Sequence, residues 1–136
     1  MGDYLVFPLV GAVSVFFFWL VELWLPYPWL VEEVFKFVLV VQIRQKVAAR
    51  ERLAAVLLSG LALGVSEAFF YLLNYVQAGS LVMFVWRLAL TVPLHLVTFL
   101  ILFWGSGGGR YRQTAALVVA GLIHFGFNRL SANIFG

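Results

Sequence analysis

Long apolar stretches, separated by short polar or glycine-rich segments, dominate the pattern of the chain. Five of them cover approximately residues 4–25, 29–43, 53–75, 81–104 and 115–135. A helix needs about 20 apolar residues to cross a hydrocarbon core roughly 30 Å thick. Lipid also requires that backbone polar groups be paired within their own segment, as a helix pairs them. The pattern therefore predicts an all-α integral membrane protein, a bundle of about five transmembrane helices forming a single domain over residues 1–136.

Basic residues are concentrated in alternate loops. Four follow the second stretch and two precede the fifth: Arg44, Lys46, Arg50, Arg52, Arg110 and Arg112. The turns at residues 26–28 and 76–80 contain no Lys or Arg. Because Lys and Arg are enriched in cytoplasmic loops, this distribution predicts a cytoplasmic N-terminus and an extracytoplasmic C-terminus in what we expect to be a prokaryotic cell membrane.

The composition agrees with this class of protein. Of the 136 residues, 64% are hydrophobic and 11% are charged, against about 25% charged in an ordinary soluble domain. The net charge is only +3, and loop residues that orient the chain account for most of the basic side chains, so nucleic acid is not an expected partner. The expected partner is the lipid bilayer. The chain has no cysteine, which excludes disulfide and thiolate chemistry.

Seven ionisable side chains nevertheless fall inside the apolar stretches: Glu32, Glu33, Lys36, Glu67, Arg87, His95 and His124. A charge near a helix centre costs about 2.5–3.5 kcal/mol on insertion scales, and such residues usually mark functional sites. With neutral histidines, three carboxylates and two cations leave one negative charge. Either a carboxyl is protonated or a histidine is charged, and both conditions suit acid–base chemistry.

Helical spacing allows these side chains to converge, since residues three or four apart share one face of a helix. The residues that share a face in this way are Glu32 with Lys36, Arg87 with Thr91 and His95, and His124 with Asn128. Glu67 adds a fourth polar face, beside the small residues Gly60 and Gly64 that favour close helix packing. We therefore expect four helices to present polar faces to a shared interior.

Depth along the helices gives a second expectation. Counted from the outer helix ends at about 1.5 Å per residue, the polar residues other than His95 lie roughly 5 to 17 Å inside. His95 lies at roughly 20 Å by the same count, unless Pro93 or a later helix start reduces that depth. The pattern predicts a polar site in the outer half of the membrane, with Glu22 reaching the outer interface instead.

The order of motifs on successive helices is distinctive. Glu32-Glu33-x-x-Lys36, Ser66-Glu67-Ala68-Phe69, Arg87 followed by Leu94-His95, and His124-x-x-x-Asn128 occur in turn. This order resembles the PrsW-type intramembrane proteases and, more distantly, the CAAX prenyl endopeptidases and bacteriocin self-immunity proteins. The resemblance covers about four fifths of the chain, from Trp29 to the C-terminus. Relatives commonly have more helices, so the missing ones are either dispensable or replaced by self-association into a homo-oligomer.

The resemblance implies an endopeptidase that hydrolyses a peptide bond of a membrane-anchored protein, such as an anti-sigma factor, without a cofactor. Glu32 would be the general base that activates a water, assisted by His95, and His124 and Asn128 would donate to the oxyanion. The expected catalytic residues are Glu32, Glu33, His95, His124 and Asn128. Lys36, with Glu33, would orient and balance Glu32, and Glu67 and Arg87 would complete the polar shell.

Two alternatives stay open. In a zinc-dependent protease, His95, His124 and one of Glu32, Glu33 or Glu67 would supply three ligands and leave a position for water. The sequence lacks the His-Glu-x-x-His signature of many such enzymes, so we expect no metal. The other alternative is a non-enzymatic immunity protein or proton-coupled transporter, because Glu and His relays inside membranes also carry protons.

Overall fold

The computed structural model describes residues 3–77 and 79–135. Over these residues the chain is helical, with no strand. Its α-helices are α1 (Val6–Glu22), α2 (Pro28–Lys46), α3 (Arg52–Phe70), α4 (Leu72–Gln77), α5 (Leu81–Ser106) and α6 (Arg110–Phe135). Short 3-10 helices at Asp3–Leu5 and Ala49–Glu51 precede α1 and α3. The predicted all-α fold is confirmed.

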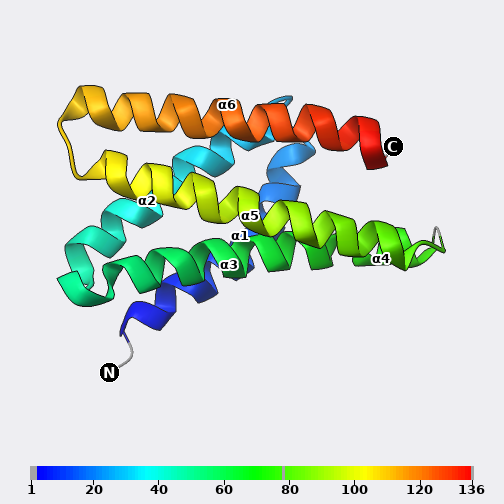
Figure 1. Ribbon diagram of the computed structural model, residues 1–136, viewed down its shortest axis with the longest axis horizontal. Helices are drawn as coiled ribbons and strands as arrows, with labels where there is room; N and C mark the ends of the chain where they lie inside the picture. The colour runs from blue at the N-terminus through cyan, green and yellow to red at the C-terminus, as the bar shows by residue number, and fades with distance from the viewer. Residues whose placement is uncertain (1–2, 78, 136) are drawn as a thin grey trace.

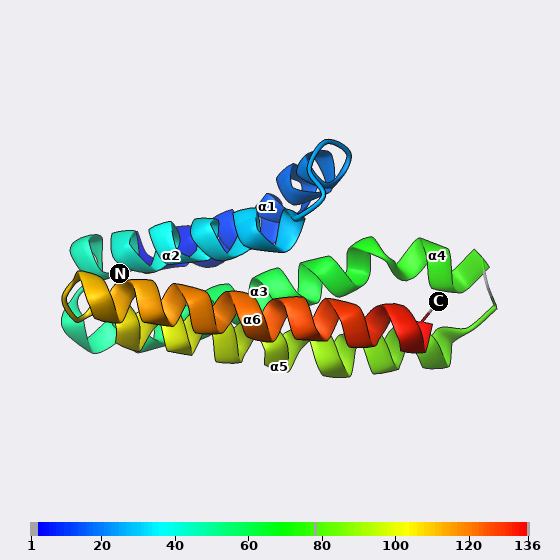
Figure 2. The ribbon, with the colours of Figure 1, turned by 90° about the horizontal axis from the view of Figure 1, so that it is seen from above.

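The helices form two layers. In Figure 1, α3, α5 and α6 run side by side, with α5 in the middle. Figure 2 shows α1 and α2 on one face of this layer. There α1 packs along α3, and α2 packs on α5 and α6. Completely buried apolar side chains from α2, α3 and α5, among them Ile43, Val56 and Phe99, fill the space between the layers.

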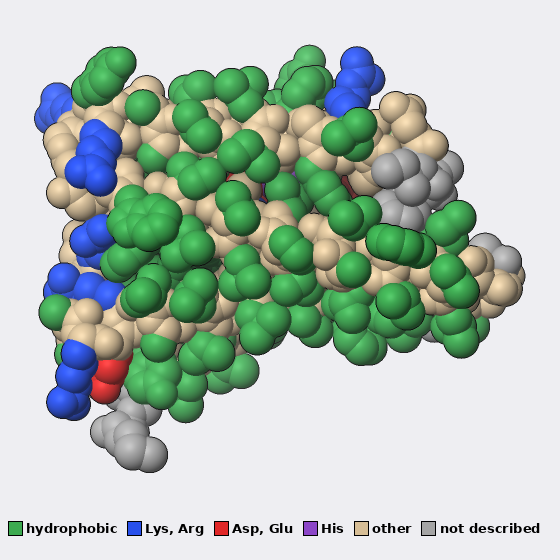
Figure 3. All heavy atoms as spheres, viewed as in Figure 1, with side chains coloured by type: hydrophobic (Ala, Val, Ile, Leu, Met, Phe, Trp, Pro, Cys, Tyr) green, Lys and Arg blue, Asp and Glu red, His purple; other side chains and the backbone are tan. Residues whose placement is uncertain are grey.

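Among the described residues, three helical segments are long and apolar enough to cross a membrane: Ala49–Gln77, Leu81–Ser106 and Arg110–Asn133. Helix α1 is apolar but has only 17 residues, about 26 Å of helix. Helix α2 is long enough but carries several charged residues, of which Glu33 and Lys36 are completely buried in the bundle. Large apolar side chains cover much of the outside, as Figure 3 shows for one face. That surface suits contact with lipid.

The helix ends differ from the predicted ones. Helix α6 begins at Arg110, so Arg110 and Arg112 lie in its first turn and not in a loop. Likewise Arg44 and Lys46 lie in the last turn of α2. Charged residues end the apolar pattern, but a helix continues beyond the hydrocarbon because water tolerates its charges. The third predicted stretch is also divided, between α3 and α4, at Tyr71.

His95 is not deeper in the bundle than the other polar residues, and the predicted offset is wrong. Its Nε2 lies 2.5 Å from Oε2 of Glu67 on the neighbouring α3. The start of α5 extends past the end of α6 and past the α1–α2 turn (Figure 1). Because α5 starts beyond the other helices, a count from its own end overstates how deep His95 lies.

The predicted close packing of α3 is confirmed. A Cβ added at Gly64 would lie 2.9 Å from Cα of Val92 and 3.1 Å from Cδ2 of His95. At Gly60 it would lie 3.2 Å from the backbone oxygen of His95. Glycine therefore lets α3 and α5 approach closely at the level where Glu67 meets His95.

Candidate functional site

Polar side chains from α2, α3, α5 and α6 meet inside the bundle. Glu32, Glu33 and Lys36 come from α2, Glu67 from α3, Arg87 and His95 from α5, and His124 from α6. Their charged and ring atoms form an unbroken chain of contacts between 2.5 and 3.8 Å. The predicted convergence of four polar faces is confirmed.

Lys36 lies at the centre of this cluster and is completely buried. Its Nζ lies 2.9 Å from Oε1 of Glu32 and 2.7 Å from Oε1 of Glu33. It also donates to Oγ1 of Thr98 at 3.2 Å. One helical turn separates Lys36 from the two glutamates, so α2 itself brings the charges together. The ammonium thereby fixes both carboxylates in place.

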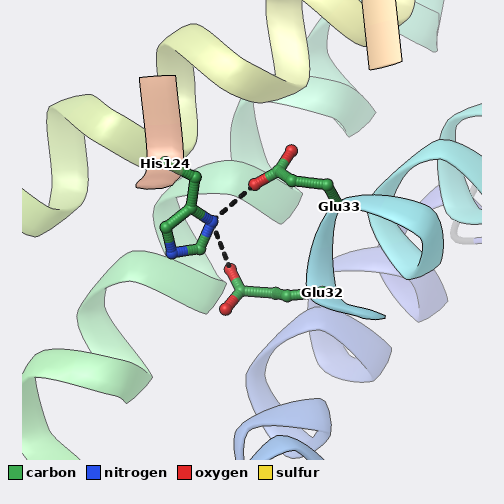
Figure 4. Close-up of side chains that lie close together, drawn as sticks. All are labelled: Glu32, Glu33 and His124. Atoms are coloured by element: carbon green, nitrogen blue, oxygen red, sulfur yellow. Dashed lines mark hydrogen bonds and ion pairs between the residues drawn. The ribbon is translucent and has the colours of Figure 1, made fainter. Parts of the chain in front are cut away.

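His124 connects α6 to both glutamates of α2 (Figure 4). Its Nδ1 lies 2.7 Å from Oε1 of Glu33 and 3.8 Å from Oε1 of Glu32. A neutral ring that donates from Nδ1 carries its lone pair on Nε2, and Nε2 donates only when the ring is an imidazolium. The protonation of His124 therefore decides whether its second nitrogen accepts or donates a proton.

His95 lies between two carboxylates and is completely buried. Its Nε2 is 2.5 Å from Glu67, and its Nδ1 is 3.3 Å from Oε1 of Glu32. The other oxygen of Glu67 accepts from Nη2 of Arg87 at 3.2 Å. The Arg87 guanidinium also stacks over the Tyr71 ring, 4.7 Å from its centre. These contacts link Arg87, through Glu67 and His95, to Glu32.

The charges of the cluster do not cancel while both histidines are neutral. Glu32, Glu33 and Glu67 face Lys36 and Arg87, which leaves one negative charge. An unbalanced charge is expensive in a low-dielectric interior. One further proton, bound by a histidine or a carboxyl group, makes the cluster neutral. This is the proton that the cluster could transfer in an acid–base reaction.

A cavity of about 440 Å³ adjoins the cluster. Glu32, Glu67, Arg87, His124 and Asn128 contribute to its lining, together with apolar side chains. Asn128 follows His124 by one turn of α6, as the spacing predicted. Glu33, Lys36 and His95 are completely buried and do not line this cavity. The structure thus distinguishes two sets of polar side chains. One set lines the cavity and could contact a bound molecule, and the other is buried behind it and fixes the positions of the first.

Sequence reasoning did not place two residues, Glu22 and Thr98, in the site. Glu22, expected to reach the outer interface, is exposed at the end of α1 and also lines the cavity. It follows Val15 and Phe18, which also line the cavity, at helical spacing. Thr98, the third oxygen partner of Lys36, follows His95 by three residues on the inward face of α5. In both cases the 3–4 residue periodicity of buried positions was the available signal.

In the described part of the chain, two groups of residues could hold a metal ion, each with ligand atoms within 4.8 Å of one another. They are Glu32 with Glu33 and His124, and Glu32 with Glu67 and His95. Each group contains one histidine, so neither matches the expected zinc alternative with His95 and His124 together. The Lys36 ammonium already lies against the carboxylates of the first group. A cation there would have to compete with Lys36.

Comparison of the chain with protein-family models, with curated proteins and with solved structures finds no match. The chemistry of the site has to be inferred from its own residues. Its most distinctive property is a pair of adjacent glutamates, of which Glu32 lines the cavity and Glu33 does not.

Proposed function

We propose that the protein is an intramembrane endopeptidase of the PrsW type, in which Glu32 activates a water for attack on a peptide bond. One observation carries the proposal. The Glu32 carboxylate lines the cavity, while Lys36, His95 and His124 lie within 2.9, 3.3 and 3.8 Å of its Oε1. A carboxylate held in this way can take up and release a proton beside a bound substrate.

The reaction begins when Glu32 removes a proton from a water in the cavity. The resulting hydroxide attacks the peptide carbonyl carbon and forms a tetrahedral oxyanion. Glu32 then passes its proton to the amide nitrogen, the C–N bond breaks, and a carboxylic acid and an amine leave. General base catalysis of this kind contributes about 10²–10⁴-fold to a rate.

The oxyanion needs donors that are in place before the reaction. His124 and Asn128 line the same cavity, one turn apart on α6. A protonated His124 donates from Nε2 while Nδ1 stays with Glu33, and the amide of Asn128 donates a second hydrogen bond. The two residues thereby stabilise the charge that develops on the substrate.

The remaining polar residues act as positioning groups. Glu33 holds Lys36 and His124 at 2.7 Å each. Glu67, paired with Arg87, holds His95 against Glu32. Both carboxylates therefore constrain a partner of Glu32 and need not touch the substrate.

Membrane location and orientation complete the proposal. The basic helix ends lie in the cytoplasm, and five crossings place the C-terminus outside. The cavity opens in the half of the bundle away from the basic ends, so the substrate is cut near its extracytoplasmic side. A single-pass protein such as an anti-sigma factor fits this geometry.

Cleavage by the reconstituted protein tests the proposal. The protein would be placed in liposomes with candidate single-pass substrates, and the products identified by mass spectrometry. We expect a defined cut that Glu32→Ala and His124→Ala abolish. Undiminished cleavage by both variants would contradict the proposal that Glu32 and His124 carry out the reaction.

Zinc-dependent proteolysis is the second candidate, because the two glutamate–histidine groups have suitable spacing. Metal analysis and chelator treatment of the purified protein separate the two chemistries, since a glutamate enzyme stays active with chelator. A non-enzymatic immunity role predicts a different result. A Glu32→Gln variant would then still protect a cell from the bacteriocin, although it cleaves nothing.

A further inference from the structure

The basic end of the molecule carries a cluster of arginines that the proposed reaction does not use. Figure 3 shows Lys and Arg side chains gathered along one edge of the molecule. Arg44 at the end of α2, Arg52 at the start of α3 and Arg112 in the first turn of α6 belong to this end. Arg52 donates from its Nε to the carbonyl oxygen of Val47, directly after α2, at 3.0 Å, and the consecutive glycines Gly107 and Gly108 lie against Arg44 and Arg112. Three helices thus bring like charges together.

Arg44 is held against the end of α5. Its Nε donates to Oγ of Ser106 at 2.6 Å and to the carbonyl oxygen of Phe103 at 3.1 Å, and its Nη2 donates to the same carbonyl. The guanidinium stacks over the Phe103 ring at 4.2 Å. These contacts fix the direction of the guanidinium and leave Nη1 outside the hydrogen bonds described.

The glycine turn between α5 and α6 lies between two of the arginines. A Cβ at Gly107 would lie 3.0 to 3.3 Å from three atoms of the Arg44 guanidinium, and a Cβ at Gly108 would overlap the Arg112 side chain. Because these glycines have no side chains, the Arg44 and Arg112 side chains can lie directly against the turn. Loss of either glycine would push one of them away.

Carboxylates do not balance this cluster in the part of the chain with described side chains. Glu51 is the one acidic residue near it, and its ion pair is with the exposed Arg50, at 3.7 Å. The other described carboxylates, Glu22, Glu32, Glu33 and Glu67, belong to the cavity and its cluster. Adjacent guanidinium groups without a carboxylate favour a bound anion, and phosphate accepts several of their hydrogen bonds at once.

We propose that Arg44 and Arg112, which lie against the glycine turn at Gly107 and Gly108, together with Arg52 at the same end of the molecule, bind the phosphate of an anionic phospholipid headgroup. Aromatic neighbours favour a lipid over a free phosphate. Trp104 precedes the turn and Tyr111 follows it, and both side chains are exposed. Exposed Trp and Tyr residues are typical of the membrane–water interface, where headgroups lie. This inference rests on the proposed membrane location and is independent of proteolysis.

Lipid binding by a matched pair of variants tests the site. Wild-type protein, Arg112→Gln and Arg50→Gln would be purified in detergent and titrated with phosphatidylglycerol or phosphatidylcholine, with bound lipid counted by native mass spectrometry. Arg112 and Arg50 are both exposed at the same end, and each substitution removes one charge. Melting without added lipid checks that each variant is folded.

The expected result is tight binding of phosphatidylglycerol that weakens about tenfold in Arg112→Gln and stays near the wild-type value in Arg50→Gln. Equal losses in the two variants would show general charge attraction and overturn the site. Wild-type protein that binds both lipids equally would overturn it too. A competing series with inorganic phosphate distinguishes the sources: displacement of the lipid by millimolar phosphate contradicts the headgroup assignment.

Discussion

Glu32 and Glu33 are adjacent in the chain but have different surroundings. One residue of helix turns the side chain by about 100°, which carries Glu32 to the cavity and Glu33 behind it. Both carboxylates contact the Lys36 ammonium, which therefore binds one carboxylate that lines the cavity and one that is buried behind it. The different roles proposed for the two residues, general base for Glu32 and positioning residue for Glu33, follow from this rotation.

Lys36 is the residue whose loss should most weaken the fold. Lys36→Met fills the same space but leaves Glu32 and Glu33 without their shared cation in a buried place. Breaking a buried ion pair in this way costs about 3–5 kcal/mol. Unfolding in detergent, followed by circular dichroism, measures the loss, with the exposed Lys46→Met on the same helix as control. Equal stability of the two variants would contradict the central place of Lys36.

Asn128 should affect the reaction and not the fold. Its side chain lines the cavity, and removal of one oxyanion donor typically lowers kcat by about 10²–10³-fold. We expect Asn128→Ala to lose cleavage to this extent while its melting temperature changes little. Asn133→Ala on the same helix, outside the cavity lining, is the matched control. A drop in cleavage that the control shares would argue against a donor role.

Sequence reasoning identified the charged residues of the site because each is costly in an apolar helix. Helical spacing alone could not choose between Glu32 and Glu33, since both lie near the inward face and their burial depends on α5 and α6; the choice of Glu32 as general base came from the family resemblance. Glu22 was not assigned to the site for a similar reason: it is exposed at the end of α1, and its place in the cavity lining depends on how α1 packs against the other helices.

The contact between α3 and α5 positions half of the site. Glu67 meets His95 where Gly64 lies against Val92, so the spacing of the two backbones fixes the hydrogen bond. Small residues at such interfaces let helices approach closely. A side chain at Gly64 would meet backbone atoms, which cannot rotate away.

Gly64→Ala should therefore separate α3 from α5 locally. Overpacking of this kind typically costs about 1–3 kcal/mol, and we expect weaker cleavage as His95 moves from Glu67. Gly126→Ala is the control, because nothing lies within 4 Å of a Cβ there. It should be neutral or stabilise α6 by up to about 1 kcal/mol through helix propensity. Melting temperatures that fall equally would contradict the tight contact.

Element boundaries show where the apolar pattern is informative and where it is not. The pattern located every long helix, because each needs an apolar stretch. It began the last helix at Ala115 and not at Arg110, where α6 starts, since hydrophobicity reports the edge of the hydrocarbon and not the limit of helical hydrogen bonding. It also misplaced His95 in depth, because a count along one helix carries no information about how far its neighbours extend.

Charge is segregated along the whole molecule. Most Lys and Arg side chains gather at one end, whereas the carboxylates of the cluster lie with Arg87 around the cavity in the other half. On the topology proposed above, this basic end lies in the cytoplasm, because Lys and Arg are enriched in cytoplasmic segments. The cavity then opens toward the opposite surface.

Cysteine labelling tests this orientation without background, because the chain has no cysteine. Arg50→Cys and Trp24→Cys introduce thiols at exposed positions at the two ends, where the Arg50 side chain is 86% exposed and the residue Trp24 is 85% exposed. A membrane-impermeant maleimide added to intact cells should label position 24 and spare position 50 until the cells are opened. The reverse pattern would invert the proposed topology.

The central claim is that Glu32, at the cavity, carries out the chemistry. The most direct measurement is the single-turnover rate of cleavage in liposomes for Glu32→Gln beside Glu51→Gln, a carboxylate outside the cavity. Both substitutions keep side-chain size and remove one acid. We expect Glu32→Gln to slow cleavage at least about 100-fold and Glu51→Gln to leave it unchanged. Wild-type rates in Glu32→Gln, with the variant folded and substrate bound, would contradict the account.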